Sequence, residues 1–522
     1  MLWPLLLPAC AGTPTDSDPE TDTVSDTDAD SDADSDADTD TDTDTDTDTD
    51  TDTDTGTTEG ILVLCGGGSE GEVGDATSWS HAAYQGILAR GDVTGDGLVQ
   101  VAVIADTEQT DWVPEYFVSL GADGAFNLLI DSTAAADNPA LEATFSSVDA
   151  VFIKGGDQGS YYDLWNDRLL ERLILEVYVT RHGGIGGTSA GAMSQSEYAL
   201  AGSADYVTAD VLFDSHTEYL DDVSDGGTSI HDDFLGLLPA TLVDTHFSTR
   251  GRLGRLAGAM ARGVEEGAPA DLLGIGLDEQ TCLTVSDRRG VVNGVGSVVF
   301  LRANAEPPLR EPGAPLVWAD LSLDRLTTGW TWDFDAAAVD VTDPPDGAEA
   351  VAWDGGQGVA TEDAWEILGS RLRDEELFAL VAERSPDPYL VRDGTTASVN
   401  DAFGLCDAHD SDMRGVNDEV LFRSLHDHLG VTGFLVGDGG ALRSGSIPGR
   451  VALGGDGRSP LATMIVDPSA VTWRSLSPSI SVEDAGDGAL HPAGLVGMKL
   501  HILYTDGSDA REWDLYARTP MP

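Results

Sequence analysis

Short apolar runs alternate with segments of helical spacing between residue 60 and about residue 300 of the chain. Such runs are typical of strands that are buried on both faces of a parallel sheet. The clearest ones are Ile61–Leu64, Val101–Ile104, Asn127–Ile130 and Ala150–Ile153. The segments between them that are long enough for helices include 80–89, 139–146 and 161–181. This alternation predicts an α/β fold with a mostly parallel sheet flanked by helices and with functional side chains at the carboxyl ends of the strands.

The pattern changes beyond about residue 305, where Pro, Gly and Asp become more frequent. Trp318, Trp330 and Trp332 stand there in alternating apolar and polar stretches, which favour β-strands. We therefore predict an α/β domain over residues 60–305 and a β-rich extension or second domain over residues 306–522. The pattern assigns no role to this second part.

The beginning of the chain has neither pattern. Residues 11–59 are largely Thr-Asp, Ser-Asp and Ala-Asp dipeptides, which cannot bury apolar surface and therefore predict a disordered linker. Residues 1–10 resemble the end of a bacterial lipoprotein signal, with Cys10 as the lipidated residue, although the apolar stretch is short and no basic residue precedes it. We expect a secreted or surface-anchored lipoprotein of a bacterial envelope, in contact with a membrane only through this lipid.

The charge of the chain limits the partners it can have. Asp and Glu number 93 against 27 Lys and Arg, which gives a formal net charge of −66 over 522 residues. Such a protein repels nucleic acids and anionic membranes, so we exclude both as partners. A cationic or arginine-bearing substrate would be attracted, but solubility or salt tolerance explains the charge equally well.

The segment Gly186–Ala192 contains the most informative candidate residue, Ser189. Small residues on both sides of one hydroxyl, between an apolar run and a helix-compatible segment over 190–200, are typical of a nucleophile elbow. The backbone N–H of Ala190 would then be available to stabilise an oxyanion. A glycine-rich turn that binds an anion, or nothing, is the alternative reading of this segment.

Other strand ends carry the remaining groups that a serine nucleophile needs. His246 ends an apolar run that contains Asp244 and is followed by arginines at 250, 252 and 255. Arginine offers a rigid fork for carboxylates, and few basic residues occur elsewhere in the chain. A third strand end carries Asp278 and Glu279, and a fourth carries the Gly155–Gln158 segment, where Gly156 can expose its backbone N–H and Gln158 can bind a ligand.

These motifs, in this order, resemble those of the cyanophycinases, which belong with the aspartyl dipeptidases among the serine peptidases. The motifs are Gly-Gly-Asp-Gln, Gly-Thr-Ser-Ala-Gly-Ala, Asp-x-His-Phe followed by Arg-Gly-Arg-x-x-Arg, and Gly-Ile-Gly-x-Asp-Glu. The resemblance covers about residues 60 to 300 and implies a class I glutamine amidotransferase-like fold, with serine in place of the cysteine nucleophile of those enzymes. It implies no metal and no other cofactor.

The resemblance also implies a role for each motif residue. Ser189 would be the nucleophile, His246 the general base and Glu279 the acid, with Asp278 as the alternative acid. The oxyanion would be held near Gly156 and Ala190. The substrate pocket would contain Gln158, Asp244, Arg250, Arg252 and Arg255. Such enzymes cleave cyanophycin, a polyaspartate with arginine on each side-chain carboxyl, to β-Asp-Arg dipeptides through an acyl-enzyme.

Two questions stay open at this level. Thr245 stands where the family usually has Gln, which leaves the substrate uncertain between cyanophycin and related β-aspartyl peptides. The alternative function is a catalytically degenerate, surface-anchored binding protein on the same scaffold. A homodimer is compatible with either function.

The remaining cysteines allow more than one state. Cys65 ends a buried strand, so we predict a plain core thiol there. A disulfide between Cys282 and Cys406 is an option in an oxidising compartment, but the sequence cannot establish it.

Overall fold

The computed structural model describes a large part of the chain after residue 59. The described residues are 60–68, 70–202, 208–221, 227–303, 307–352, 377–383, 422, 425–426, 431–437, 440–444, 450–455, 461–477, 492–505, 512–514 and 519–521. All of them belong to one compact unit, Thr57–Pro522. The predicted signal with Cys10, the predicted linker over 11–59, and Cys406 lie outside these residues.

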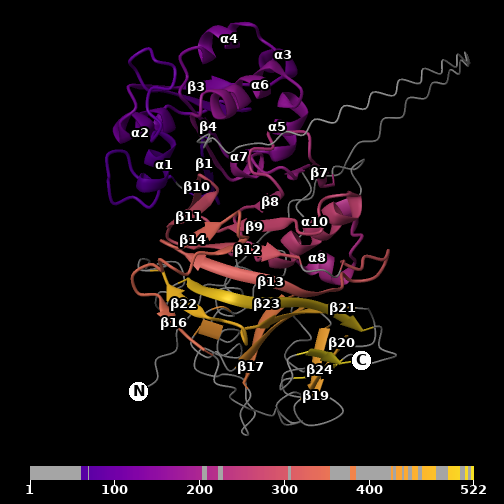
Figure 1. Cartoon of the computed structure of the whole chain (residues 1–522). Coiled ribbons are helices and arrows are strands. Elements are labelled where there is room, and N and C mark those ends of the chain that lie inside the picture. The colour runs from indigo at the N-terminus through magenta and orange to yellow at the C-terminus, as the bar shows by residue number, and fades with distance from the viewer. Residues whose placement is uncertain are drawn as a thin grey trace, which may run out of the picture. The chain divides into compact units, whose positions relative to one another are not determined.

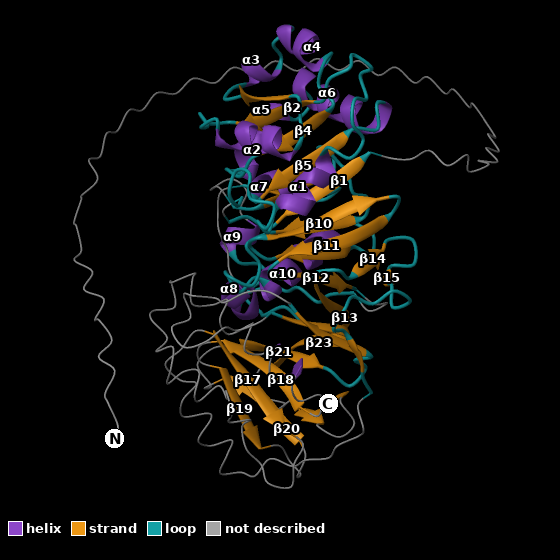
Figure 2. Ribbon diagram, turned by 90° about the vertical axis from the view of Figure 1, so that its left-hand side faces the viewer, coloured by secondary structure: helices purple, strands orange, loops and turns teal. Residues whose placement is uncertain are grey.

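The first sheet contains the predicted apolar runs. Within the described residues it has nine strands in the order β15-β14-β11-β10-β1-β5-β4-β2-β3. The five strands from β1 to β3 in this order pair in parallel, and the other neighbours pair antiparallel. Figure 2 shows β2, β4, β5, β1, β10 and β11 side by side in this sequence. The strands are β1 (Ile61–Cys65), β2 (Gln100–Ala105), β3 (Gly124–Leu129), β4 (Ala150–Ile153), β5 (Gly184–Thr188), β10 (Thr281–Ser286), β11 (Arg289–Gly294), β14 (Thr331–Asp333) and β15 (Ala338–Val339).

Helices cover both faces of the parallel strands, because successive side chains of a strand point to opposite faces. Val63 and Val103 belong to an apolar cluster with α1 (His81–Ile87) and α2 (Trp112–Leu120). Leu62 and Ile104 belong to a second cluster with the helices after β3. These are α3 (Thr133–Ala136), α4 (Ala140–Phe145), α5 (Gln158–Trp165), α6 (Leu169–Leu175), the π-helix η1 (Glu176–Thr180) and α7 (Ala190–Met193). The prediction of a mixed α/β architecture is confirmed.

The single helix predicted over 161–181 is interrupted. α5 ends at Trp165 and α6 begins at Leu169. Between them Asp167 has a φ of +58°, which no helix accommodates. The Asp167 N–H donates to the buried Glu171 carboxylate, 2.6 Å away, so a side chain takes the place of a helical carbonyl as the acceptor.

A second sheet joins strands from both halves of the chain. Its order among the described residues is β17-β18-β21-β23-β13-β12-β9-β8, with β16 and β22 attached to it beside β23. Apart from the parallel pair of β8 and β9, its strands pair antiparallel. They are β8 (Thr241–Asp244), β9 (Leu273–Leu277), β12 (Ser297–Arg302), β13 (Trp318–Thr327), β16 (Glu349–Ala350), β17 (Leu377–Glu383), β18 (Val431–Gly437), β21 (Leu461–Asp467), β22 (Trp473–Leu476) and β23 (Ala493–Thr505).

The predicted boundary at residue 305 falls inside this second sheet. β12 precedes the boundary and β13 follows it, yet the two pair from Ser297↔Thr327 to Arg302↔Ser322. In Figure 1 the strands β12, β13 and β23 lie next to one another although their colours run from red to yellow. The β-rich residues after 306 thus extend a sheet that already begins with β8 and β9.

The other described elements belong to neither of these two sheets. Two short strands, β6 (Ala199–Ala201) and β7 (Ser229–His231), pair with each other. Between them are α8 (Thr208–Phe213) and α9 (Glu218–Asp221), and α10 (Leu253–Glu266) follows β8. The last strands, β19 (Gly440–Ser444), β20 (Arg450–Gly455), β24 (Glu512–Asp514) and β25 (Thr519–Met521), form a separate sheet.

Candidate active site

Ser189 stands in the turn between β5 and α7. Its backbone has a φ of +52° and a ψ of −122°, a conformation that residues other than glycine rarely adopt. Its N–H donates to the carbonyl oxygen of Cys65 at the end of β1, 2.9 Å away. A Cβ at Gly191 would lie 2.2 Å from the carbonyl oxygen of Ile153, so only glycine lets α7 approach β4 this closely. The turn therefore has the strained geometry of a nucleophile elbow.

The helix after this turn is shorter than the predicted segment over 190–200. α7 ends at Met193, and three polar side chains then take backbone carbonyls as acceptors. The Ser194 hydroxyl donates to Ala190, the Gln195 amide to Gly191 and the Ser196 hydroxyl to Met193. Such local bonds compete with a continuing helix.

His246 and Glu279 form a hydrogen-bonded chain with Ser189. The Ser189 Oγ lies 2.8 Å from Nε2 of His246, and Nδ1 of His246 lies 2.6 Å from Oε1 of Glu279. His246 follows β8 and Glu279 follows β9, and because these neighbours are parallel their carboxyl ends lie at the same edge. The three side chains have the order of nucleophile, base and acid that acyl transfer uses.

The glycines after β1 support the histidine. Gly67 has a φ of +104°, and a Cβ there would lie only 2.3 Å from Cε1 of the His246 ring. The N–H of His246 donates to the carbonyl oxygen of Gly66 at 2.8 Å. The run of three glycines at Gly66–Gly68, directly after an apolar run, is the sequence signal for this close approach.

Asp278 does not face the histidine. Its carboxylate accepts the N–H of Ser248 at 2.9 Å, the N–H of Ser297 at 2.8 Å and the Ser297 hydroxyl at 2.5 Å. Of the two acids that the sequence left open, Glu279 is the one that contacts His246, whereas Asp278 bonds to Ser248 and Ser297.

The hydrogen bond from His246 holds the pKa of the Glu279 carboxyl below its ordinary value, against the opposing effect of partial burial. The positive charges of Arg250 and Arg252 lower this pKa further. The carboxyl is therefore ionised under neutral conditions, as an acceptor for the imidazole N–H must be.

The lowered pKa predicts a pH-dependent contribution of Glu279 to stability. A carboxyl of this kind stabilises the fold above the pKa of an unfolded glutamate, about 4.3, and loses that effect as the pH falls through its lower folded-state pKa. We expect Glu279→Gln to lower the free energy of unfolding at neutral pH and to make less difference as the buffer is acidified. Denaturant titrations of both proteins from about pH 7 to about pH 3 measure this, and a difference independent of pH would contradict it.

A cavity of about 270 Å³ opens beside the Ser189 hydroxyl. It is lined by Gly156, Asp157, Gln158, Ser189, Met193, Gly202, Thr245, His246, Arg250, Arg252 and Arg255. Three of these residues are arginines, so the cavity favours a ligand with carboxylate groups.

Asp244 lies behind the arginines and not in the cavity wall. Its side chain is fully buried and lies 3.0 Å from Nη1 of Arg252 and 3.0 Å from Nε of Arg255. The carboxylate therefore orients two of the three cavity arginines, whereas the sequence had placed Asp244 itself among the substrate contacts. Within the described part of the chain, the Arg250 side chain makes no ion pair.

The other predicted pocket residues surround the nucleophile. Gln158 begins α5, and its amide donates to the carbonyl oxygen of Gly202 at 3.2 Å. Gly156 lines the cavity, and a Cβ on its neighbour Gly155 would lie 3.2 Å from the Ser189 Cβ. Ala190 is the first residue of α7, so its N–H has no acceptor within that helix.

Thr245 also lines the cavity, although its side chain is almost wholly buried. Its hydroxyl contacts the Met193 sulfur at 3.4 Å. The Thr245 hydroxyl is thus directed at a buried side chain of α7.

Cys65 and Cys282 form a disulfide, so the prediction of a plain thiol at Cys65 is wrong. The two residues are opposite each other on β1 and β10, and both are fully buried. Cys282 is therefore bonded to Cys65 and not to Cys406, the partner considered from the sequence. Cys65 precedes the Gly66–Gly68 turn and Cys282 follows Glu279 by three residues, so the bond joins two segments of the site.

The described residues also bear on metal binding and on membrane spanning. Among them no group of three His, Cys, Asp or Glu side chains is arranged to hold a metal ion. In the part of the chain that the structure describes, no helix has the length and apolar character to cross a membrane.

Known proteins resemble this chain in part of its sequence. No protein-family model matches the chain. The cyanophycinases of Nostoc sp. and Trichormus variabilis are each 32% identical to it over 219 residues, 41% of this chain and 66% of theirs. The cyanophycinase of Geminocystis herdmanii is 28% identical over 214 residues, 40% of this chain and 71% of that protein. This chain is cyanophycinase-like.

The similarity of this cyanophycinase-like chain to its relatives is partial. The matched stretch covers just under two thirds of the length of the Nostoc and Trichormus proteins. Among solved structures, a peptidase from an acI-B1 Actinobacterium matches 50% of this chain and 97% of its own length, with 18% identity and a TM-score of 0.33.

Proposed function

We propose that this chain is a serine-type peptidase that hydrolyses cyanophycin, or related β-aspartyl peptides, to β-Asp-Arg dipeptides. The observation that carries the proposal is the contact of Ser189, His246 and Glu279 in one hydrogen-bonded chain beside an arginine-lined cavity. The similarity to cyanophycinases supports the substrate class. The fold that goes with it is the class I glutamine amidotransferase-like one, with Ser189 in the position of the cysteine nucleophile.

The chemistry follows from the geometry of the three side chains. Because Glu279 accepts from Nδ1 of His246, the imidazole carries its proton there and Nε2 can take the proton of the Ser189 hydroxyl. The oxygen then attacks the carbonyl carbon of the scissile amide. The protonated imidazole gives its proton to the leaving amine, and a water molecule activated by the same His246 hydrolyses the acyl-enzyme.

The negative oxygen of the tetrahedral intermediate needs donors that are already in place. We assign this role to two backbone N–H groups, those of Gly156, which lines the cavity together with Ser189, and of Ala190, the first residue of α7. Loss of one such donor costs about 10²- to 10³-fold in the rate of comparable enzymes.

The arginines determine which ligand fits. Asp244 neutralises part of the charge of Arg252 and Arg255, so Arg250 is the cation of the cavity with the most charge left for a substrate carboxylate. The net charge of −66 attracts the arginine side chains of cyanophycin from a distance. Both features suit a substrate that carries carboxylates and guanidinium groups.

The substrate is tested by incubating the full chain with insoluble cyanophycin and measuring dipeptide release by mass spectrometry. β-Asp-Arg as the main soluble product is the expected result. If cyanophycin is untouched but a β-aspartyl peptide is cut, the reaction class stands and the polymer is excluded. If neither is cut by a folded protein, the peptidase proposal fails and the degenerate binding protein takes its place.

Arg250 is expected to act mainly in binding. Arg250→Ala should raise KM by about 10- to 100-fold with a much smaller change in kcat, because a charge-assisted hydrogen bond contributes about 1.5–3 kcal/mol. Steady-state kinetics on a soluble β-aspartyl peptide measure the two constants separately. Arg288→Ala removes the same charge from an exposed pair with Asp335 and serves as the control. Equal effects of the two variants would contradict this role.

The cellular location is part of the proposal. A buried Cys65–Cys282 disulfide suits a protein that folds in an oxidising compartment, which supports export to a bacterial envelope. A lipid on Cys10 and a homodimer are further elements of this proposal. Mass spectrometry of the mature N-terminus and light scattering of the purified chain test them directly.

A further inference from the structure

Arg325 is a fully buried residue of β13 that reaches the catalytic segments from the β-rich half of the chain. Its Nη2 lies 3.2 Å from the hydroxyl of Ser248 and 3.4 Å from the carboxylate of Asp278. Ser248 comes two residues after His246, and Asp278 immediately precedes Glu279. One guanidinium thus contacts a close neighbour of the catalytic base and a close neighbour of the catalytic acid.

The Asp278 carboxylate ties these two segments together. It accepts the backbone N–H of Ser248 and, on its other oxygen, the N–H and hydroxyl of Ser297. Its side chain is only 7% exposed, and burial of a carboxylate is costly unless a cation or strong donors compensate it. Arg325 is the cation that faces it.

Arg325 is itself held by residues far along the chain. Its Nη1 donates to the carbonyl oxygen of Ala493 at 3.0 Å, and its guanidinium lies 4.8 Å from the centre of the Phe422 ring. β13 is fixed on one side by β12 and on the other by β23. The position of this guanidinium is therefore set by the part of the chain to which the sequence assigned no role.

We propose that Arg325 is a positioning residue for the hydrolytic reaction, through which the β-rich half of the chain sets the relative placement of His246 and Glu279. This inference rests on the proposed function. It gives the β-rich half a role in catalysis through Arg325, which acts on Ser248 and Asp278 beside the catalytic residues. Displacing reacting groups by about 1 Å can cost about 10²-fold in rate, so a change at Arg325 should act on kcat.

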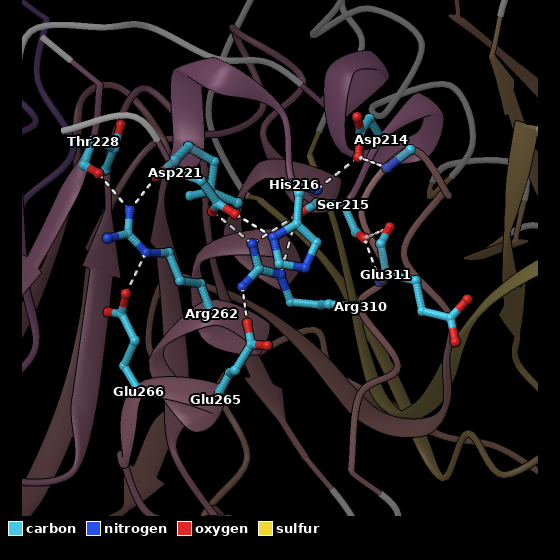
Figure 3. A network of polar contacts seen from close by, with 12 residues as sticks. Asp214, Ser215, His216, Asp221, Thr228, Arg262, Glu265, Glu266, Arg310 and Glu311 are labelled. Carbon is cyan, nitrogen blue, oxygen red and sulfur yellow. Dashed lines mark hydrogen bonds and ion pairs between the residues drawn. The ribbon is translucent and has the colours of Figure 1, made fainter. Parts of the chain in front are cut away.

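The test compares two buried arginines, Arg325→Lys and Arg310→Lys. Lysine keeps the charge but loses the planar fork that bridges two acceptors. Arg310 is 4% exposed, pairs with Asp221 at 2.6 Å and also with Glu265, and donates to the carbonyl oxygen of Ser215. Figure 3 shows it among these partners, and none of them adjoins a catalytic residue in the chain. It is therefore a matched control for the structural cost of the substitution.

The readout is the labelling of Ser189 by a fluorophosphonate in the full chain, measured over a range of probe concentrations together with the melting temperature. For Arg325→Lys we expect the limiting labelling rate constant to fall about 10- to 100-fold while the half-saturating concentration stays within about twofold. For Arg310→Lys we expect a lower melting temperature and an unchanged labelling rate constant.

A second, milder variant keeps the test decisive if Arg325→Lys does not fold. Ser248→Ala removes only the hydroxyl that accepts from Arg325, so the limiting rate constant should fall by a smaller factor, about 3- to 10-fold. If Arg325→Lys folds and is labelled at the wild-type rate, the inference is overturned. If Arg325→Lys does not fold, a wild-type labelling rate in Ser248→Ala overturns it. If the wild-type chain is not labelled, the proposed function itself fails, which is a distinct result.

Discussion

Replacement of Ser189 with alanine is expected to slow hydrolysis of β-aspartyl peptides by about 10⁴-fold or more, with substrate binding unchanged. The Ser189 hydroxyl is the group within hydrogen-bond distance of His246 that can form the acyl-enzyme. The arginines that would bind the substrate do not depend on it. The same loss is expected for His246→Ala, because without a base the hydroxyl is a poor nucleophile.

Two measurements check this result. Turnover of a soluble β-aspartyl peptide gives the rate, and calorimetric titration of the Ser189→Ala protein with the same peptide gives the affinity. Ser194→Ala is the matched control, since Ser194 is a buried serine five residues further on whose hydroxyl donates to the carbonyl oxygen of Ala190. Substantial turnover or fluorophosphonate labelling in Ser189→Ala would show that another residue is the nucleophile.

Removal of the Cys65–Cys282 disulfide is expected to lower the free energy of unfolding by about 2–5 kcal/mol. The bond joins residues 217 positions apart, so it restricts a long loop of the unfolded chain. A loss of activity should accompany it, because the Cys65 carbonyl accepts the Ser189 N–H and the next residue, Gly66, accepts from His246.

Denaturant titration of Cys65→Ala/Cys282→Ala against wild type measures the loss. Both sulfur atoms are buried, so reductant that is added to the folded wild type and removed before the titration should leave the midpoint unchanged. Reductant added during refolding should reduce the cysteines and give the midpoint of the double variant. Equal midpoints for wild type refolded with and without reductant would contradict a stabilising role of the bond.

Much of the candidate site could be predicted from local sequence. The apolar runs marked the parallel strands, and polar residues directly after such runs had to lie at the carboxyl edge of a sheet. Ser189 after β5, His246 after β8 and Glu279 after β9 all follow this rule. The glycines around Ser189 indicated the turn, because no residue larger than glycine fits where α7 meets β4.

Contacts between distant segments could not be predicted in this way. Asp278 and Glu279 are chemically similar neighbours, and only the path of β9 decides which one faces His246. The sequence did not indicate a partner for Cys65, because its pairing with Cys282 requires β10 to run beside β1. The pattern change near residue 305 suggested a boundary, whereas β12 and β13 continue one sheet across it.

The sequence by itself determined the chemical groups and the strand ends at which they lie, because hydrophobic periodicity and small-residue turns are properties of neighbouring residues. The tertiary structure alone decided which of these groups touch and what holds them. Asp244 pairs with Arg252 and Arg255, Cys65 is bonded to Cys282, and Arg325 pairs with Asp278. Asp244, Cys65 and Arg325 belong to three different strands. The physical reason is that such contacts join residues far apart in sequence, so they depend on how the strands are ordered in the sheets and not on any local pattern.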